Sequence, residues 1–174
     1  MYIFIDLDDT ILDFKKAEEQ ALKKTLVSLD IEPSEENVQT YSIINEGLWK
    51  KLETGEMTRD QILIKRFDGL FEKLNIQRDS VLANETYVKN LSVGHWFIDG
   101  AEMLLESLYK NHKLYIVSNG TTIVQNGRIE SAGIKKYFEK IFLSQDIGYN
   151  KPDIRFFEEC FKQVGPFDKN DAII

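Results

Sequence analysis

The stretch "IFIDLDDT", residues 3–10, joins a short apolar run to a crowd of acidic side chains. Asp6, Asp8 and Asp9 follow directly on that run. Like charges at the end of a buried strand repel each other, so folding alone does not favour them there. Because side chains two residues apart on an extended segment point the same way, the carboxylates of Asp6 and Asp8 can face one pocket. We therefore expect a cation beside them, most simply Mg²⁺, which prefers oxygen ligands.

The composition is that of a globular protein with its own core: of 174 residues, 43% are hydrophobic and 29% charged. The net charge of -7 argues against binding to a nucleic-acid polymer, because such proteins gather Lys and Arg. The lone cysteine, Cys160, allows no intramolecular disulfide and suits the cytoplasm. No run reaches the roughly 18 apolar residues of a membrane span, so no membrane partner is expected. His95 and His112 lie far apart and are interpreted as structural.

Short apolar runs alternate with amphipathic segments in the second half of the chain. Continuous apolar runs suit parallel strands that are buried on both faces. We predict strands at residues 2–5, 113–117, 141–143 and, as the start of a fourth, 172–174. Helices are predicted at 98–111, 121–132 and 153–164, the last with Ile154, Phe157, Phe161 and Val164 on its apolar face. This alternation predicts an α/β fold with a doubly wound, Rossmann-like parallel sheet.

Residues 14–94 interrupt this pattern and look helical throughout, with a capping box at Thr58 and Gln61. We predict four helices there, forming a helical-bundle cap inserted into a core made of residues 1–13 and 95–174. The insertion follows the carboxyl end of the first strand, where open α/β sheets bind ligands. A lid is therefore favoured over a purely packing role.

Two more groups follow later strands. The second strand ends in Ser118-Asn119-Gly120, and a helix start follows at Thr121, which together make an anion site. Lys151 follows the third strand, just before a helix that Pro152 is expected to open, and can direct an ammonium into the same crevice.

Each of these signals also has a structural interpretation. Asp9 or Thr10 could simply cap the next helix, Thr121 or Thr122 could cap an ordinary turn, and Lys151 could be solvated. The order of these groups along the chain favours the functional interpretation over the structural one. A carboxylate pair, a hydroxyl and a lysine, each at the end of a successive strand, form a set of groups that suits phosphoryl transfer.

The same residues resemble the motifs of the haloacid dehalogenase-like hydrolases. Asp6-Leu7-Asp8-Asp9-Thr10 matches their DxDx[TV] motif, Ser118 in "IVSNG" their second motif, and Lys151 in "GYNKPD" their third. The resemblance covers the whole chain, including the helical cap. The stretches "DLDDTILDFKKAEEQAL" and "SQDIGYNKPD" resemble the branch of pyrimidine 5′-nucleotidases.

The resemblance implies a role for each matched residue. Asp6 is the expected nucleophile, which forms an aspartyl-phosphate, and Asp8 the general acid and base. Mg²⁺ is expected on Asp6 and on the backbone carbonyl of Asp8. Ser118, Asn119 and Lys151 are expected to hold the phosphate. The implied activity is hydrolysis of a small phosphorylated metabolite, first of all a nucleoside 5′-monophosphate.

The family's fourth motif, which completes the metal shell, would follow the next strand. The sequence stops at Ile174, inside the run expected to form that strand, and Asp168 and Asp171 precede the run. We expect the missing metal ligand to lie beyond Ile174. We also expect the 174-residue chain to be truncated, to bind Mg²⁺ poorly and to be slow or inactive.

Other functions fit the same residues. A sugar-phosphate phosphatase or a phosphomutase keeps the chemistry and changes the substrate. Aromatic residues either stack on a base or belong to the core; these are Phe14, Tyr41, Trp49 and Trp96. A non-catalytic phospho-receiver or binding module also uses an acidic pair, a hydroxyl and a lysine. A receiver needs its phosphorylated Asp after a later strand, where this chain has Ser144 and then Asp146. The oligomeric state is left open.

Overall fold

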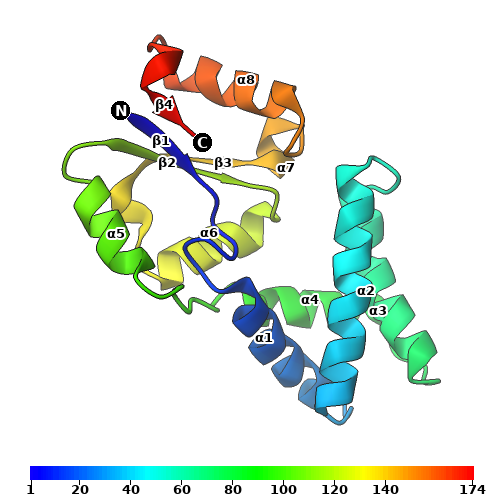
Figure 1. Cartoon of the computed structure of the whole chain (residues 1–174). Coiled ribbons are helices and arrows are strands. Elements are labelled where there is room, and N and C mark those ends of the chain that lie inside the picture. The colour runs from blue at the N-terminus through cyan, green and yellow to red at the C-terminus, as the bar shows by residue number, and fades with distance from the viewer. The chain divides into compact units, whose positions relative to one another are not determined.

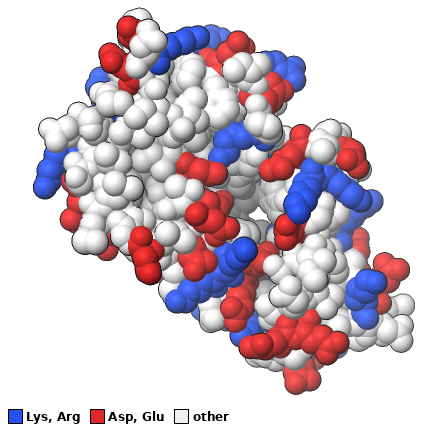
Figure 2. All heavy atoms as spheres, in the orientation of Figure 1, with Lys and Arg blue, Asp and Glu red and all other residues white.

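The computed structural model describes all residues from Met1 to Ile174, and the chain forms two compact units (Figure 1). One unit contains residues 1–16 and 95–174, and the other contains residues 17–94. None of the helices combines the length and apolar character that crossing a membrane requires. On the face in Figure 2, Lys and Arg are interspersed with Asp and Glu.

The first unit is built on a four-stranded parallel sheet of order β3-β2-β1-β4. The strands are β1 (Tyr2–Ile5), β2 (Lys113–Ser118), β3 (Phe138–Leu143) and β4 (Ala172–Ile173). Ile3 pairs with Leu114 of β2 on one side and with Ile173 of β4 on the other. Because all strands run the same way, the residues that follow β1, β2 and β3 lie together at the carboxyl ends of the strands.

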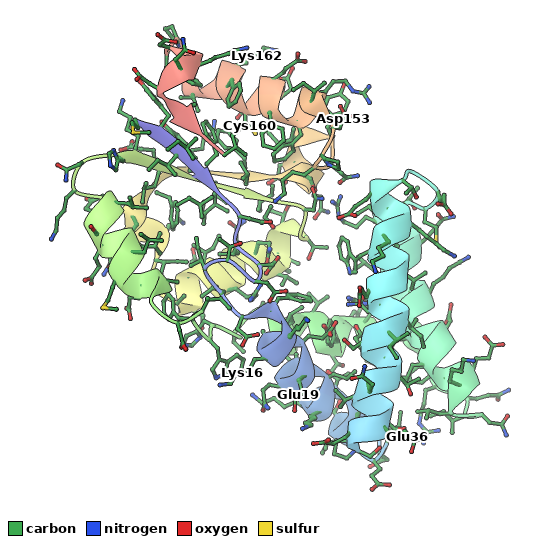
Figure 3. The ribbon with its side chains drawn as sticks, viewed as in Figure 1. Lys16, Glu19, Glu36, Asp153, Cys160 and Lys162 are labelled. Atoms are coloured by element: carbon green, nitrogen blue, oxygen red, sulfur yellow. The ribbon has the colours of Figure 1, made fainter.

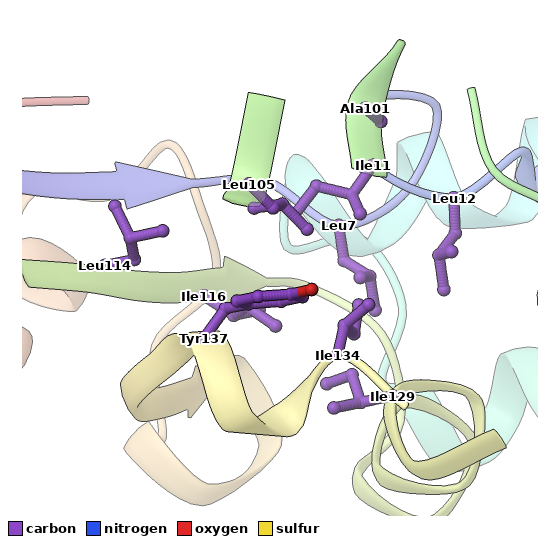
Figure 4. Packing of buried hydrophobic residues seen from close by; sticks show 10 residues of the cluster. All are labelled: Leu7, Ile11, Leu12, Ala101, Leu105, Leu114, Ile116, Ile129, Ile134 and Tyr137. Carbon is purple, nitrogen blue, oxygen red and sulfur yellow. The ribbon is translucent and has the colours of Figure 1, made fainter. Parts of the chain in front are cut away.

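Helices cover both faces of this sheet, which confirms the predicted doubly wound α/β fold (Figure 1). The helices of this unit are α5 (Ala101–Leu108), α6 (Thr122–Ser131), α7 (Ser144–Ile147) and α8 (Ile154–Val164). Leu114 and Ile116 of β2 pack toward α5 and α6, in the cluster of Figure 4. Tyr115 and Val117 point the other way, toward Phe156 of α8. This alternation is the two-residue period of a strand that is buried on both faces.

Two sequence predictions, on the start of β3 and on the buried face of α8, need correction. Strand β3 begins at Phe138 and not at residue 141, because it lies at the edge of the sheet, where the exposed Glu139 and Lys140 break the apolar run. Ile154 was expected on the buried face of α8 but is 66% exposed. At about 100° per residue, Ile154 lies about 140° from the centre of the buried stripe around Phe156 and Cys160.

The second unit contains most of a run of four helices, as the sequence predicted. They are α1 (Phe14–Ser28), α2 (Glu35–Glu53), α3 (Arg59–Lys73) and α4 (Ser80–Leu91). The predicted capping box opens α3, with both Thr58 and Gln61 bonds present. The ring of Tyr41 lies 5.2 Å from that of Phe67 and 5.4 Å from that of Tyr87, measured between centroids. Tyr41 is fully buried, so it belongs to the core and not to a stacking surface.

Cys160 lies on the side of α8 that faces the sheet (Figure 3), and burial raises the pKa of its thiol to about 12. Only the thiolate form of a cysteine attacks a thiol reagent. At pH 8 the native Cys160 thiol is protonated because of its raised pKa, and it is also covered by the residues packed around it. We expect an aromatic disulfide reagent to label Cys160 far more slowly in the native protein than in the protein unfolded in urea. The absorbance of the released aromatic thiol measures the labelling rate. Equal labelling rates in the two states would contradict this buried position.

Candidate active site

Asp6 follows β1 directly, and its carboxylate is held at both oxygens. Oδ1 accepts a hydrogen bond of 2.8 Å from the backbone N–H of Leu7. Oδ2 forms an ion pair of 2.8 Å with Nζ of Lys151. The Asp6 side chain is 44% exposed, so the carboxylate is oriented yet still open to solvent. An oriented, accessible carboxylate beside a cation has what a nucleophile needs.

A tight loop follows Asp6 and directs Asp8 elsewhere. The carbonyl of Leu7 accepts from the N–H groups of both Ile11 and Leu12, at 3.0 and 2.9 Å. Asp9 takes a positive φ of 54°, and its Oδ1 accepts from the N–H of Phe14 at the start of α1. The capping interpretation therefore holds for Asp9, while Asp6 and Asp8 make other contacts.

The carboxyl of Asp8 is bound by two residues of α6. Nη1 of Arg128 donates to Oδ1 in an ion pair, and Nε2 of Gln125 donates to Oδ2 at 2.6 Å. Burial, and to a smaller degree the charge of Asp6, raises the pKa of the Asp8 carboxyl above its usual value, against the opposing effect of Arg128 and Gln125. A carboxyl with a raised pKa is suited to give a proton to a leaving group.

Sequence reasoning missed Gln125 and Arg128. The signal for them was their spacing, because residues three apart on a helix share a face. The helix that follows Ser118 has its N-terminus at the same edge of the sheet as Asp8. What the sequence did not indicate is that Arg128 is fully buried.

Ser118 ends β2 and is 1% exposed. Its Oγ accepts from the N–H of Gly120 at 3.1 Å and from Nε2 of Gln125 at 2.7 Å. Ser118 and Asp8 are therefore joined through one side chain. At the start of α6, the N–H of Thr122 donates to Gln145 at 2.8 Å, so this N–H of the predicted anion site already has a protein acceptor.

Asn119 clamps the backbone of Lys151. Its Oδ1 accepts from the Lys151 N–H at 2.7 Å, and its Nδ2 donates to the Lys151 carbonyl at 2.9 Å. The predicted contact of Asn119 with phosphate stays a prediction. The structure places its side chain where it fixes the lysine.

Lys151 contacts residues at the ends of both β1 and β2. Its Nζ donates to the carbonyl of Val117 at 3.0 Å as well as pairing with Asp6. One detail of the sequence prediction was wrong: α8 begins at Ile154, after an N-cap at Asp153, so Pro152 does not open the helix. The cap is Asp153 Oδ1, which accepts from the N–H of Arg155, at the end of α8 where Figure 3 labels Asp153.

Two oxygens are available here for a hard cation. One belongs to the Asp6 carboxylate, and the other is the Asp8 carbonyl, which the backbone hydrogen bonds of the loop leave unused. No group of three or more His, Cys, Asp or Glu side chains gathers around a possible metal position. Mg²⁺ binds proteins through one or two carboxylates and keeps its other positions for water and phosphate, so this donor set fits it.

The two late aspartates lie elsewhere, as expected from the sequence. Ala172 pairs with Tyr2 at the start of β1. Asp168 and Asp171 precede Ala172, so they lie at the opposite end of the sheet from Asp6.

The comparisons with known proteins agree with this arrangement. Residues 2–174 match the family of haloacid dehalogenase-like hydrolases. The chain belongs to this family. The predictions of a hydrolase and of the family are thereby confirmed.

Individual relatives span the same region. YfnB of Bacillus subtilis, described as a HAD-hydrolase, is 36% identical over 172 residues, which cover 99% of this chain and 73% of YfnB. The pyrimidine 5′-nucleotidase PynA of Streptococcus pneumoniae is 30% identical over 174 residues, with the same two coverages of 99% and 73%. The crystal structure of YfnB bound to magnesium superimposes with a TM-score of 0.93 at 35% identity, covering 98% of this chain and 77% of that one.

Proposed function

We propose that this chain carries the active site of a Mg²⁺-dependent phosphomonoester hydrolase that acts through an aspartyl-phosphate on Asp6. The observation that carries the proposal is the contrast between two neighbouring carboxyl groups. Asp6 is half-exposed and paired with Lys151, whereas Asp8 is held by Gln125 and Arg128 and has a raised pKa. Two carboxyls in two environments suit the division into nucleophile and acid.

In the proposed first step, a carboxylate oxygen of Asp6 bonds to phosphorus while the bond from phosphorus to the ester oxygen breaks. The leaving oxygen keeps the electron pair and takes a proton from Asp8. In the second step Asp8, now ionised, takes a proton from water. The resulting hydroxide attacks phosphorus, and phosphate leaves as Asp6 regains its carboxylate.

Lys151 and Ser118 are the proposed donors to the phosphoryl oxygens. Preorganised donors of this kind are usually the largest contribution to catalysis. The carboxylate of Asp6 and the carbonyl of Asp8 would hold Mg²⁺, and the bound ion supplies positive charge that reduces repulsion between Asp6 and a phosphate. This charge is the proposed reason why aspartates crowd the end of β1.

The proposed substrate is a small phosphorylated metabolite, first of all a pyrimidine nucleoside 5′-monophosphate. Its support is the 30% identity with PynA over 99% of this chain. The proposal includes no nucleic-acid polymer and no membrane as partner, and it places the protein in the cytoplasm. The role of residues 14–94 as a cap stays a prediction.

The test is phosphate release by the full-length gene product with Mg²⁺ from a panel of esters. The panel pairs pyrimidine and purine nucleoside 5′-monophosphates with sugar phosphates and p-nitrophenyl phosphate. We expect Mg²⁺-dependent release, with pyrimidine 5′-monophosphates among the best substrates, and its loss in EDTA.

Other results would point to other functions. Release confined to sugar phosphates would keep the reaction and change the substrate. A stable modified protein from acetyl phosphate, without turnover, would favour a phospho-receiver and contradict the proposal.

A further inference from the structure

The side chain of Gln125 joins the ends of two strands. Its Nε2 donates to Oδ2 of Asp8 at 2.6 Å and to Oγ of Ser118 at 2.7 Å. Its Oε1 accepts from Nη1 of Arg128 at 3.4 Å. Gln125 is 1% exposed, so this amide lies in the interior, where a misplaced polar group is costly. Both donors and the acceptor of one carboxamide are thus engaged at the proposed site.

These bonds fix the role that Ser118 can play. A serine hydroxyl has two lone pairs and one O–H. The two lone pairs of Oγ receive the N–H of Gly120 and the amide of Gln125. The hydroxyl is left to donate its hydrogen, and a phosphoryl oxygen is an acceptor only. Gln125 therefore makes Ser118 a donor.

The same amide fixes the orientation of Asp8. Oδ1 faces Arg128 and Oδ2 faces Gln125, so the carboxyl cannot rotate without breaking one of the two contacts. Arg128 is itself held, because it is fully buried and its guanidinium lies 5.5 Å from the centre of the Phe14 ring. Two residues of α6, Gln125 and Arg128, thus hold the carboxyl of Asp8 in one orientation.

Gly120 provides an independent observation. A Cβ at this position would lie 2.5 Å from both Cδ and Nε2 of Gln125, a separation that real Cβ atoms do not reach. Gly120 is absent from the glycines with positive φ, so its φ angle does not require glycine. What requires it is the volume of the Gln125 amide.

We infer that Gln125 is a positioning residue that orients the carboxyl of Asp8 and makes the Ser118 hydroxyl a donor, in the space that Gly120 leaves. This inference rests on the proposed function. Gln125→Met keeps the length of the side chain and removes its donors. The value of kcat/KM reports the steps up to and including transfer of the phosphoryl group to Asp6. In that transfer an alkoxide leaving group needs a proton, whereas a stabilised phenolate does not.

We expect Gln125→Met to lower kcat/KM for a nucleoside monophosphate by about 10- to 100-fold, the range of a lost hydrogen bond to a charged group. The loss on p-nitrophenyl phosphate is expected to be clearly smaller, because its leaving group departs without a proton. Gly120→Ala should show the same contrast with the Gln125 side chain chemically intact. Gln163→Met on the exposed side of α8 and Gly47→Ala, where a Cβ meets nothing within 4 Å, are the matched controls and should change neither substrate.

Equal losses on the two substrates would overturn the inference, because its Asp8 part requires an additional loss on the ester whose leaving group needs a proton. The loss of the Ser118 donor, like a smaller amount of active protein, lowers the rate on both esters alike. No loss would overturn it as well. If the unaltered protein hydrolyses no ester, the proposed function fails, and crystal structures decide the inference separately. Asp8 and Ser118 in new rotamers in Gln125→Met would support the positioning role, and unmoved side chains would overturn it.

Discussion

Asp6→Asn is expected to abolish Mg²⁺-dependent phosphate release by the full-length gene product, with a loss of about 10⁴-fold or more. An amide oxygen is a poor nucleophile and cannot carry the phosphoryl group. The change keeps the size of the side chain, and the amide oxygen can still accept from the N–H of Leu7. Asp6 is half-exposed, so the lost ion pair with Lys151 should cost about 1 kcal/mol of stability or less. Steady-state phosphate release and thermal unfolding measure the two effects.

Asp13→Asn is a matched control from the same segment. Oδ1 of Asp13 accepts from the N–H of Lys16 at the start of α1, and asparagine caps helices equally well. This variant should keep its activity and its unfolding temperature. An Asp6→Asn protein that retained most of its Mg²⁺-dependent release would contradict the aspartyl-phosphate mechanism.

The sheet, and the position of Lys151 at the same end of the strands as Asp6, were predicted from the sequence. Apolar runs such as Tyr2–Ile5 mark strands buried on both faces, and the carboxyl ends of parallel strands share one edge. Because β1 and β3 run parallel in one sheet, Asp6 and Lys151 lie at the same end of it, although 144 intervening residues separate them in the sequence. The parallel topology of the sheet therefore determines that these two residues lie at the same end of it.

The surroundings of Asp8 did not follow in the same way. An arginine in a helix is normally a surface residue, and the burial of Arg128 depends on a carboxylate 120 positions earlier in the chain. The amide of Gln125 has its role only because Gly120 leaves a space beside it. Such contacts depend on side-chain packing, which the hydrophobic pattern does not encode. The same reason explains Asn119, whose clamp on Lys151 needs the loop after β3 in place.

Lys151→Gln is expected to lower kcat by about 10²- to 10³-fold, the usual effect of removing one preorganised donor from a site where charge develops. The ammonium of Lys151 lies 2.8 Å from Oδ2 of Asp6 and 3.0 Å from the carbonyl of Val117, and the Lys151 side chain is 18% exposed. Its position does not depend on a substrate, because Asn119 holds the backbone and Val117 the ammonium. Glutamine keeps a donor but removes the charge. Initial rates over a range of substrate concentrations give kcat and KM separately.

The control is Lys162→Gln on α8, where the side chain is 74% exposed and its ammonium pairs only with Glu159, at 3.4 Å. Both variants lose one positive charge, so a general effect of net charge on the binding of anions would appear equally in the two. A loss of kcat confined to Lys151→Gln therefore assigns the charge to the reaction. A rise in KM with kcat unchanged would instead mean that Lys151 binds the substrate and its transition state equally, and the assigned role in stabilising the transition state would be wrong.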